Sequence, residues 1–177
     1  MPEAYAKTRL SSRHAGGTLE SLDTFGPGMS STDDTLKLED FLCFAVYSAN
    51  HAFNRVYKPM LDRLGLTYPQ YVAMVTLWTE DGLTVGQIGD RVLLETNTLT
   101  PLLKRLESAG LVRRVRDAAD ERQVRIHLTE KGRALRHEAE RIPREMGMCL
   151  ERDPAALGAL TDELTRVRDK LLSRLKP

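Results

Sequence analysis

The sequence has no long apolar run, so it offers no candidate for a membrane-spanning helix. Its 177 residues are 41% hydrophobic and 29% charged, which is typical of one soluble globular domain with a sizeable core. An excess of one charge is also missing, because 26 Lys and Arg side chains stand against 25 Asp and Glu, for a formal net charge of +1. This balance excludes a uniformly basic nucleic-acid binder. Any affinity for DNA must come from cations that are concentrated locally.

Cysteine is scarce. Cys43 and Cys149 are the only two, they are far apart, and no secretory signal is recognisable, so we expect a reducing cytoplasm rather than a disulfide scaffold. The four histidines are scattered, and no close-spaced Cys and His motif for a metal ion is present. We therefore expect neither a metal site nor a cofactor.

The first part of the chain shows no apolar periodicity. Residues 1–35 are rich in Gly, Ser and Thr, which favours a mobile extension. The folded domain is expected over residues 36–177.

Two helices are predicted at the start of that domain. Apolar residues recur at spacings of three and four over residues 38–56, which predicts a long helix that ends near Pro59, with a shorter helical piece to Leu64. Residues 67–70 form a capping box with proline in the first turn, and they start a second helix that closes at Gly82.

The stretch 83–129 has the pattern of a winged helix-turn-helix, with a short helix, a turn, a second helix and a basic hairpin. Thr84 and Gln87 form a capping box in which each side chain satisfies a free backbone N–H of the other residue. The short helix that follows has one apolar face made of Val85, Ile88 and Val92.

The second helix of the unit has two distinct faces. It is expected to begin within residues 95–97, with Pro101 early enough that its missing N–H costs little, and to stop at Gly110. The inward side is predicted to carry Leu99, Leu102, Leu103, Leu106 and Ala109. The outward side carries Asn97, Thr100, Lys104 and Ser108. Such small, polar or cationic groups suit a helix that reads base edges and phosphates in a major groove.

A β-hairpin is predicted after this helix. Apolar and polar residues alternate over 111–116 and 124–128, with a polar connector over 117–123. The arginines of the hairpin are Arg113, Arg114, Arg116, Arg122 and Arg125. An isolated run of arginines indicates a solvated face of the hairpin. Here the preceding helix, with its polar outward side, favours contact of these arginines with DNA instead. Asp120 is placed to hold Arg122 for insertion into a narrow minor groove.

Helices are expected again after the hairpin. Thr129 caps one that runs to about Pro143 and continues, with a kink, to Leu150, and Asp153 precedes the last helix. That last helix carries a nearly heptad stripe of Leu157, Leu160, Leu164, Val167, Leu171 and Leu175. Packing inside the monomer would cover it, but a partner helix in a two-fold homodimer is the more economical explanation. The fold class is thus mostly α with a small β-hairpin wing, flanked by N- and C-terminal dimerisation helices.

Two runs of sequence resemble a known family. Residues 102–112 and 120–132 are similar to the reading helix and wing of MarR-family regulators, and the similarity extends over residues 36–150. The resemblance implies a homodimer, paired through its terminal helices, that binds double-stranded DNA. Such a dimer would read two half-sites of a pseudo-palindromic operator about 34 Å apart.

Residues 42–71 resemble more narrowly the OhrR branch of this family, whose members sense organic hydroperoxides. A lone cysteine among apolar residues is ordinarily a small buried hydrophobe. The resemblance instead implies that Cys43 is the peroxide-reactive thiol, that Tyr47 and Tyr57 bond to it, and that Cys149 resolves its sulfenic acid as an intersubunit disulfide.

The expected function is therefore a repressor rather than an enzyme. The reduced protein would bind its operator, and the protein oxidised at Cys43 by an organic hydroperoxide would release it. Two alternatives stay open at this point. One is a MarR-like repressor that senses a small aromatic ligand with both cysteines inert, and the other is a thiol-dependent peroxidase.

Overall fold

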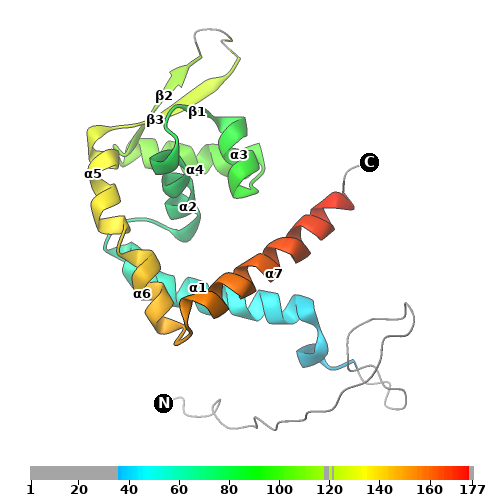
Figure 1. Cartoon of the computed structure of the whole chain (residues 1–177). Helices are drawn as coiled ribbons and strands as arrows, with labels where there is room; N and C mark the ends of the chain where they lie inside the picture. The colour runs from blue at the N-terminus through cyan, green and yellow to red at the C-terminus, as the bar shows by residue number, and fades with distance from the viewer. Residues whose placement is uncertain (1–35, 118–119, 121, 176–177) are drawn as a thin grey trace. The chain divides into compact units, whose positions relative to one another are not determined.

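The computed structural model describes residues 36–117, 120 and 122–175 (Figure 1). The predicted extension over residues 1–35 lies outside the described residues. The chain divides into two compact units, one ending at Phe44 and the other beginning at Ala45.

The described part of the first unit contains a short 3₁₀ helix, η1 (Leu38–Asp40), and the start of α1 (Leu42–Asp62). Phe41 between them has extended backbone angles, φ −90° and ψ 124°, so the prediction of one helix from Leu38 onward was wrong. The reason is that a 3₁₀ turn also brings residues three apart to one side, so apolar spacing does not distinguish the two conformations.

Pro59 lies inside α1 and does not end it, contrary to the prediction. Because Pro59 has no N–H, the Arg55 carbonyl lacks its hydrogen-bond donor within the helix. The helix nevertheless continues to Asp62, because Leu61 is buried in the core at 2% exposure. Lys58 and Asp62 form an ion pair of 2.9 Å across this last turn.

Helix α2 (Tyr68–Thr79) forms the centre of the second unit and packs against α3, α4 and α5. Its start matches the predicted capping box, since Gln70 Oε1 accepts hydrogen bonds from the backbone N–H (2.8 Å) and hydroxyl (3.0 Å) of Thr67. Near its end the Trp78 indole N–H donates to the Gly132 carbonyl in α5 (2.8 Å). Gly82 then turns the chain with φ +77°, as predicted.

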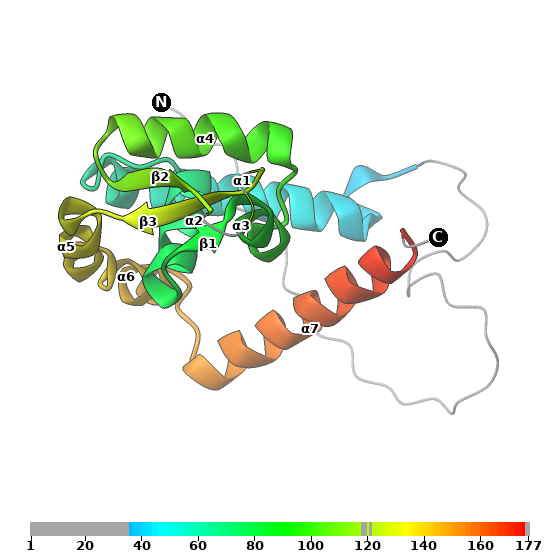
Figure 2. The same ribbon diagram turned by 90° about the horizontal axis from the view of Figure 1, so that it is seen from above.

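The helix-turn-helix consists of α3 (Val85–Val92) and α4 (Thr96–Ser108), and Figure 2 shows α3 at the end of α4 where α4 begins. The capping box of α3 is confirmed, because Thr84 Oγ1 accepts from the Gln87 N–H (3.2 Å) and Gln87 Oε1 from the Thr84 N–H (2.9 Å). Gly110 follows α4 with φ +72°, also as predicted.

Helix α4 begins within residues 95–97 as predicted, but Pro101 does not lie in its first turn. It is the sixth residue of α4, beyond the first turn, so its missing N–H deprives the Asn97 carbonyl of its intrahelical donor. The helix tolerates this loss because Leu99, Leu102 and Leu103 on either side of Pro101 are all buried.

The predicted hairpin is confirmed as β2 (Val112–Arg116) and β3 (Val124–Leu128), paired antiparallel with Val112 opposite Leu128. The sequence reading missed β1 (Leu83–Thr84), which pairs antiparallel with β3 and places Leu83 opposite Ile126. The resulting sheet has the order β1-β3-β2. The two residues of β1 are too few to show a period of two.

The region after the wing is divided differently from the prediction. Helix α5 (Glu130–Ala139) is capped by Thr129 as expected, and α6 (Ile142–Cys149) is a separate helix with Pro143 in its first turn. Proline has no N–H and its ring clashes with the carbonyl four residues back, so α5 ends at Ala139. Helix α7 (Pro154–Ser173) begins after Asp153, whose carboxylate accepts from the Ala156 N–H (2.8 Å).

The core lies in the second unit, where α2, α3 and α4 meet the sheet and α5. Its largest fully buried side chains are Leu61, Met74, Leu77, Leu83, Ile88, Leu99, Leu103, Leu106, Val112, Ile126 and Ile142. Helix α7 contributes no buried residue to this core. Within the described part of the chain, no helix combines the length and apolar character needed to cross a membrane.

Candidate nucleic-acid interface and thiol sites

Helix α4 separates an apolar face from a polar one, as the sequence predicts. Leu99, Leu102, Leu103 and Leu106 are at most 8% exposed, whereas Asn97, Lys104 and Ser108 are exposed and Thr100 is half-buried. Ala109 was expected to face inward, but it is exposed. The reason is that Ala109 is the C-cap residue and Gly110 turns the chain away, so the helical phase no longer applies there.

Three arginines of the wing, Arg113, Arg116 and Arg122, are exposed and accessible to a phosphate backbone. Arg114 is half-buried, and its backbone N–H donates to Glu107 Oε1 (3.1 Å), which ties β2 to α4. We refer to α4 and the β2-β3 hairpin together as the reading face.

Arg125 has a different role from the other wing arginines. Its guanidinium pairs through Nε with the Asp117 carboxylate, and its Nη1 donates to the Gly82 carbonyl (2.9 Å). Asp117 is 7% exposed, so this is a largely buried anion held by its pair. Arg125 therefore fixes the wing to the segment before β1.

Asp120 organises the tip of the wing. Its carboxylate accepts one hydrogen bond from the backbone N–H of Arg122 and one from Gln123 Nε2, both 3.0 Å long. The sequence suggested that Asp120 would hold the Arg122 guanidinium, but the described bond is to the backbone. An aspartate bonded to the amide two residues on stabilises a turn, so Asp120 shapes the backbone that presents Arg122.

Asp81, in the turn after α2, bonds to two elements at the base of the wing. Its carboxylate accepts from the N–H of Leu128 (2.8 Å) in β3, from the N–H of Gly82 (2.9 Å) and from Arg133 Nη2 (2.6 Å) in α5. Burial by itself would raise the pKa of Asp81, but these hydrogen bonds and the Arg133 charge outweigh it and hold the pKa below its ordinary value. The ionised carboxylate thus connects the turn after α2 to β3 and α5.

Both cysteines are free and exposed in the described chain. Cys43 is the second residue of α1 and Cys149 is the last residue of α6. The ordinary expectation of a buried structural cysteine is therefore not met at Cys43. Tyr47 follows Cys43 by four residues in α1, is 60% exposed, and makes an edge contact with the His51 ring at 4.4 Å between centroids.

Tyr57 lies in an aromatic cluster that the sequence reading did not identify. Its ring centroid is 4.9 Å from that of Tyr68 and 6.3 Å from that of Tyr71, and Tyr71 is 6.4 Å from Trp78. Burial raises the pKa of Tyr57, with further contributions from Tyr68 and Tyr71, so its phenol stays protonated and able to donate. Tyr68 and Tyr71 were recognisable only as residues of the α2 start.

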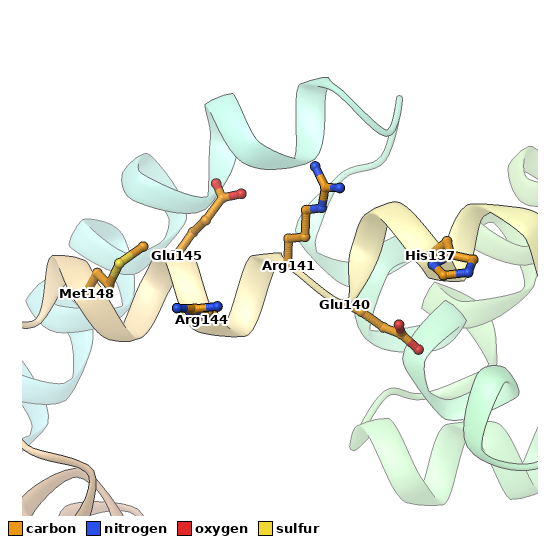
Figure 3. A pocket seen from close by; sticks show the side chains of 6 residues that line it. All are labelled: His137, Glu140, Arg141, Arg144, Glu145 and Met148. Carbon is orange, nitrogen blue, oxygen red and sulfur yellow. The ribbon is translucent and has the colours of Figure 1, made fainter.

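A hollow of about 520 Å³ follows α5 and α6, and Figure 3 shows the side chains that line it. The lining residues are His137, Glu140, Arg141, Arg144, Glu145 and Met148. Arg63 pairs with Glu145 at 2.6 Å and lines an adjoining hollow of about 370 Å³. Because carboxylates and guanidiniums are mixed along it, the surface selects neither sign of charge. No group of three or more His, Cys, Asp or Glu able to hold a metal ion occurs among the described residues.

The chain is similar to several known transcriptional regulators. The family model described as "Transcriptional regulator SarA/Rot" matches residues 55–139. The HTH-type transcriptional regulator TtmR of Methylorubrum extorquens is 49% identical over 148 residues, which cover 82% of this chain and 76% of TtmR. The organic hydroperoxide resistance transcriptional regulator of Bacillus subtilis is 46% identical over 115 residues, covering 65% of this chain and 78% of the relative.

Among solved structures, the chain is similar to reduced AbfR bound to DNA. The two are 36% identical with a TM-score of 0.63, over 73% of this chain and 90% of AbfR. The same protein, from Staphylococcus epidermidis, is also solved in a disulfide-formed state, with a TM-score of 0.55 and 36% identity over 71% of this chain and 88% of that one.

Proposed function

Because the chain belongs to the MarR family of winged-helix transcriptional regulators, we propose that it is a redox-responsive repressor of the organic-hydroperoxide type. In the reduced state it binds a pseudo-palindromic operator as a homodimer. Oxidation of Cys43 by an organic hydroperoxide, with Cys149 as the resolving thiol, releases the DNA.

One observation carries this proposal. Both cysteines are exposed free thiols, in a chain 46% identical to a regulator of organic hydroperoxide resistance. An exposed thiol is accessible to an oxidant, whereas a buried structural cysteine is inert. AbfR is solved bound to DNA in a reduced and in an overoxidised state, and separately in a disulfide-formed state, which supports a proposal in which the disulfide, rather than oxidation alone, releases the DNA.

The chemistry needs two steps. The Cys43 thiolate attacks an oxygen of the hydroperoxide, the O–O bond breaks, and the leaving alkoxide takes up a proton and departs as an alcohol while the sulfur becomes a sulfenic acid. Cys149 of the partner subunit then attacks that sulfur, a disulfide forms, and hydroxide leaves and combines with the thiol proton as water. Tyr47 and Tyr57 would donate hydrogen bonds that stabilise the Cys43 thiolate.

The homodimer would be held by helices that are incompletely covered in the single chain. On α7, Leu160, Leu164 and Leu171 are 44 to 65% exposed, and on α1 Val46 and Phe53 are also exposed. Large apolar side chains on one helix face favour pairing with a second copy. A disulfide formed between subunits would change the separation of the two α4 helices, which must match half-sites about 34 Å apart.

The test is a gel-shift assay with and without one equivalent of cumene hydroperoxide, run beside non-reducing electrophoresis. Wild-type protein should release DNA and form a disulfide-linked dimer. Cys43→Ser should keep its DNA after treatment, and Cys149→Ser should still form the Cys43 sulfenic acid but not the disulfide-linked dimer. If Cys43→Ser still releases DNA, or if the wild-type disulfide lies within one chain, the proposed switch is wrong.

A ligand sensor is the second candidate, favoured by the hollow along α5 and α6. In this alternative, a small aromatic molecule bound in the dimer cleft would change DNA affinity without thiol chemistry. The double variant Cys43→Ser, Cys149→Ser separates the two functions, because a response that persists in it belongs to a ligand and one that disappears belongs to the thiols. Turnover of excess peroxide by the wild-type protein would instead indicate a peroxidase.

A further inference from the structure

The turn between α3 and α4 contains a residue in an uncommon conformation. Leu93 has φ +56° and ψ +42°, in the left-handed region where a side chain with a Cβ is disfavoured. Its side chain is also 55% exposed, so burial does not offset the strain. Such a conformation persists only where the surrounding structure enforces it, and residues of this kind cluster at functional sites.

The backbone explains why the left-handed angle is needed at this position. The N–H groups of Leu93 and Leu94 both donate to the Gly89 carbonyl, and the half-buried Leu94 packs against the core. A Cβ at Gly89 would lie 2.8 Å from the Leu94 carbonyl oxygen, so the turn also depends on that close approach. Glycine at position 93 would allow the same turn without strain. What leucine adds there is its side chain.

The position of that side chain suggests what it meets. Leu93 lies three residues before Thr96, the first residue of α4, and the next residue of that helix, the exposed Asn97, belongs to the proposed reading face. In that groove, the apolar group that base pairs present is the C5-methyl of thymine. An exposed aliphatic side chain at the edge of a helix that otherwise offers amides, hydroxyls and amines would complement that methyl group.

We propose that Leu93 is a specificity-determining residue that contacts a thymine methyl group in each operator half-site. The inference deepens the proposed DNA-binding function and rests on it. The strained backbone holds the leucine outward, and DNA covers it when the protein binds.

The test needs a DNA probe, which selection from a random-sequence duplex pool by the reduced wild-type protein provides. Single thymines of the selected duplex are then replaced by deoxyuridine, which lacks only the methyl group. We expect wild-type protein to lose affinity about fourfold at one such position in each half-site, the effect of burying one methyl-sized group. Leu93→Gly should bind the methylated and unmethylated duplexes equally.

The stability of the variant gives a second, independent measurement. Leu93→Gly should unfold at a higher urea concentration than wild type, because the strain is removed, while its affinity for the selected duplex falls. Leu93→Met, which keeps an apolar side chain, should retain most of the affinity. Glu151→Gly is a matched control, since Glu151 also has a positive φ (+49°) but follows α6, away from the reading face. It should gain stability and bind DNA as wild type does.

The outcomes separate this inference from the function on which it rests. If selection yields no preferred sequence, specific DNA binding itself fails and the role of Leu93 fails with it. If selection succeeds but no thymine position responds to loss of its methyl group, or if Leu93→Gly shows the same response as wild type, the inference about Leu93 is wrong while the DNA-binding function stands.

Discussion

Asp117 and Arg125 pair at the end of the β2-β3 ladder next to the connector, where the carboxylate is 7% exposed and the guanidinium also reaches the Gly82 carbonyl. The wing is thus joined to the segment before β1 by a side chain from its own second strand. The wing has five arginines that look alike in the sequence. Arg125 differs from the other four because it stabilises the hairpin that carries them.

Arg125→Ala should therefore lower stability first and DNA binding only as a consequence. The substitution leaves the Asp117 carboxylate without its charged partner, and a lost hydrogen bond to a charged group typically costs about 1.5 to 3 kcal/mol. Urea unfolding of the reduced protein measures this effect. A variant that unfolds as wild type does would mean that the pair contributes nothing to the wing.

Arg122→Ala is the contrasting variant, since Arg122 is exposed and its backbone is held by Asp120. It should unfold like wild type but bind the operator more weakly, by about 1 to 3 kcal/mol if the guanidinium enters the minor groove. Asp120→Ala should cause a smaller loss in the same direction because it loosens the tip. Fluorescence anisotropy with labelled operator gives both values. Unchanged affinity in the two variants would exclude the tip from the interface.

Lys104→Ala should weaken binding to all sequences by a similar factor, because a lysine that contacts phosphate carries no sequence information. The dependence of log K on log salt should become shallower by about one for each phosphate that is no longer neutralised. Asn97→Ala and Thr100→Ala should instead relax the preference for particular bases. Binding measured at several salt concentrations distinguishes the two kinds of change. A salt slope identical to wild type for Lys104→Ala would mean that this lysine does not bind phosphate.

Tyr57→Phe should slow the reaction of Cys43 with organic hydroperoxide by about tenfold, since it removes a donor that would stabilise the thiolate. DNA binding by the reduced protein should not change. The rate is measured by trapping the sulfenic acid in the Cys149→Ser background. Tyr71→Phe serves as a control that loses a phenol hydroxyl from the same aromatic cluster. Equal rates for wild type and Tyr57→Phe would leave Tyr57 a packing residue.

Asp81→Asn tests, through its pH dependence, the connection of the turn after α2 to β3 and α5. The pKa of Asp81 is lowered in the folded protein, so its contribution to stability is present above the unfolded value near 3.9 and is lost as the pH falls through the lower folded value. Wild type should thus exceed the variant in stability at pH 7, by about 1.5 to 3 kcal/mol, and the gap should close in acid.

Asp62→Asn is the control for this comparison. Asp62 pairs with Lys58 but is 60% exposed, and such surface pairs contribute about 0 to 1 kcal/mol. Urea unfolding from pH 7 down to pH 3 should show a converging pair of curves for Asp81→Asn only. A gap that stays constant across this range would show that the asparagine disturbs packing rather than removing an ionised acceptor.

The features that the sequence predicted correctly depend on residues that are only a few positions apart in the chain. The two faces of α4 follow from leucines three and four apart, and the hairpin follows from alternation on either side of a polar connector. The capping boxes at Thr84 and Thr67 join residues only three apart. Each of these patterns is complete within one helix or one hairpin.

The features that were missed depend on residues distant in the sequence or on backbone angles. Asp81 meets Leu128 across 47 positions, and no local pattern indicates that pair. Arg125 looks like any other wing arginine until β3 is placed beside β1. The left-handed angle of Leu93 is hidden because leucine ordinarily indicates a helix or a core, not a strained turn.

The hydrogen bond from Trp78 to the Gly132 carbonyl has a practical consequence. Trp78 is the single tryptophan of the chain, and its half-buried indole lies where α2 meets α5. Its emission spectrum is therefore an unlabelled optical signal from one known junction of the molecule. A shift of this emission to longer wavelength on treatment with hydroperoxide would mean that water has reached the junction between α2 and α5. The time course of the shift would show whether the junction opens before or after the thiols are lost and the DNA is released.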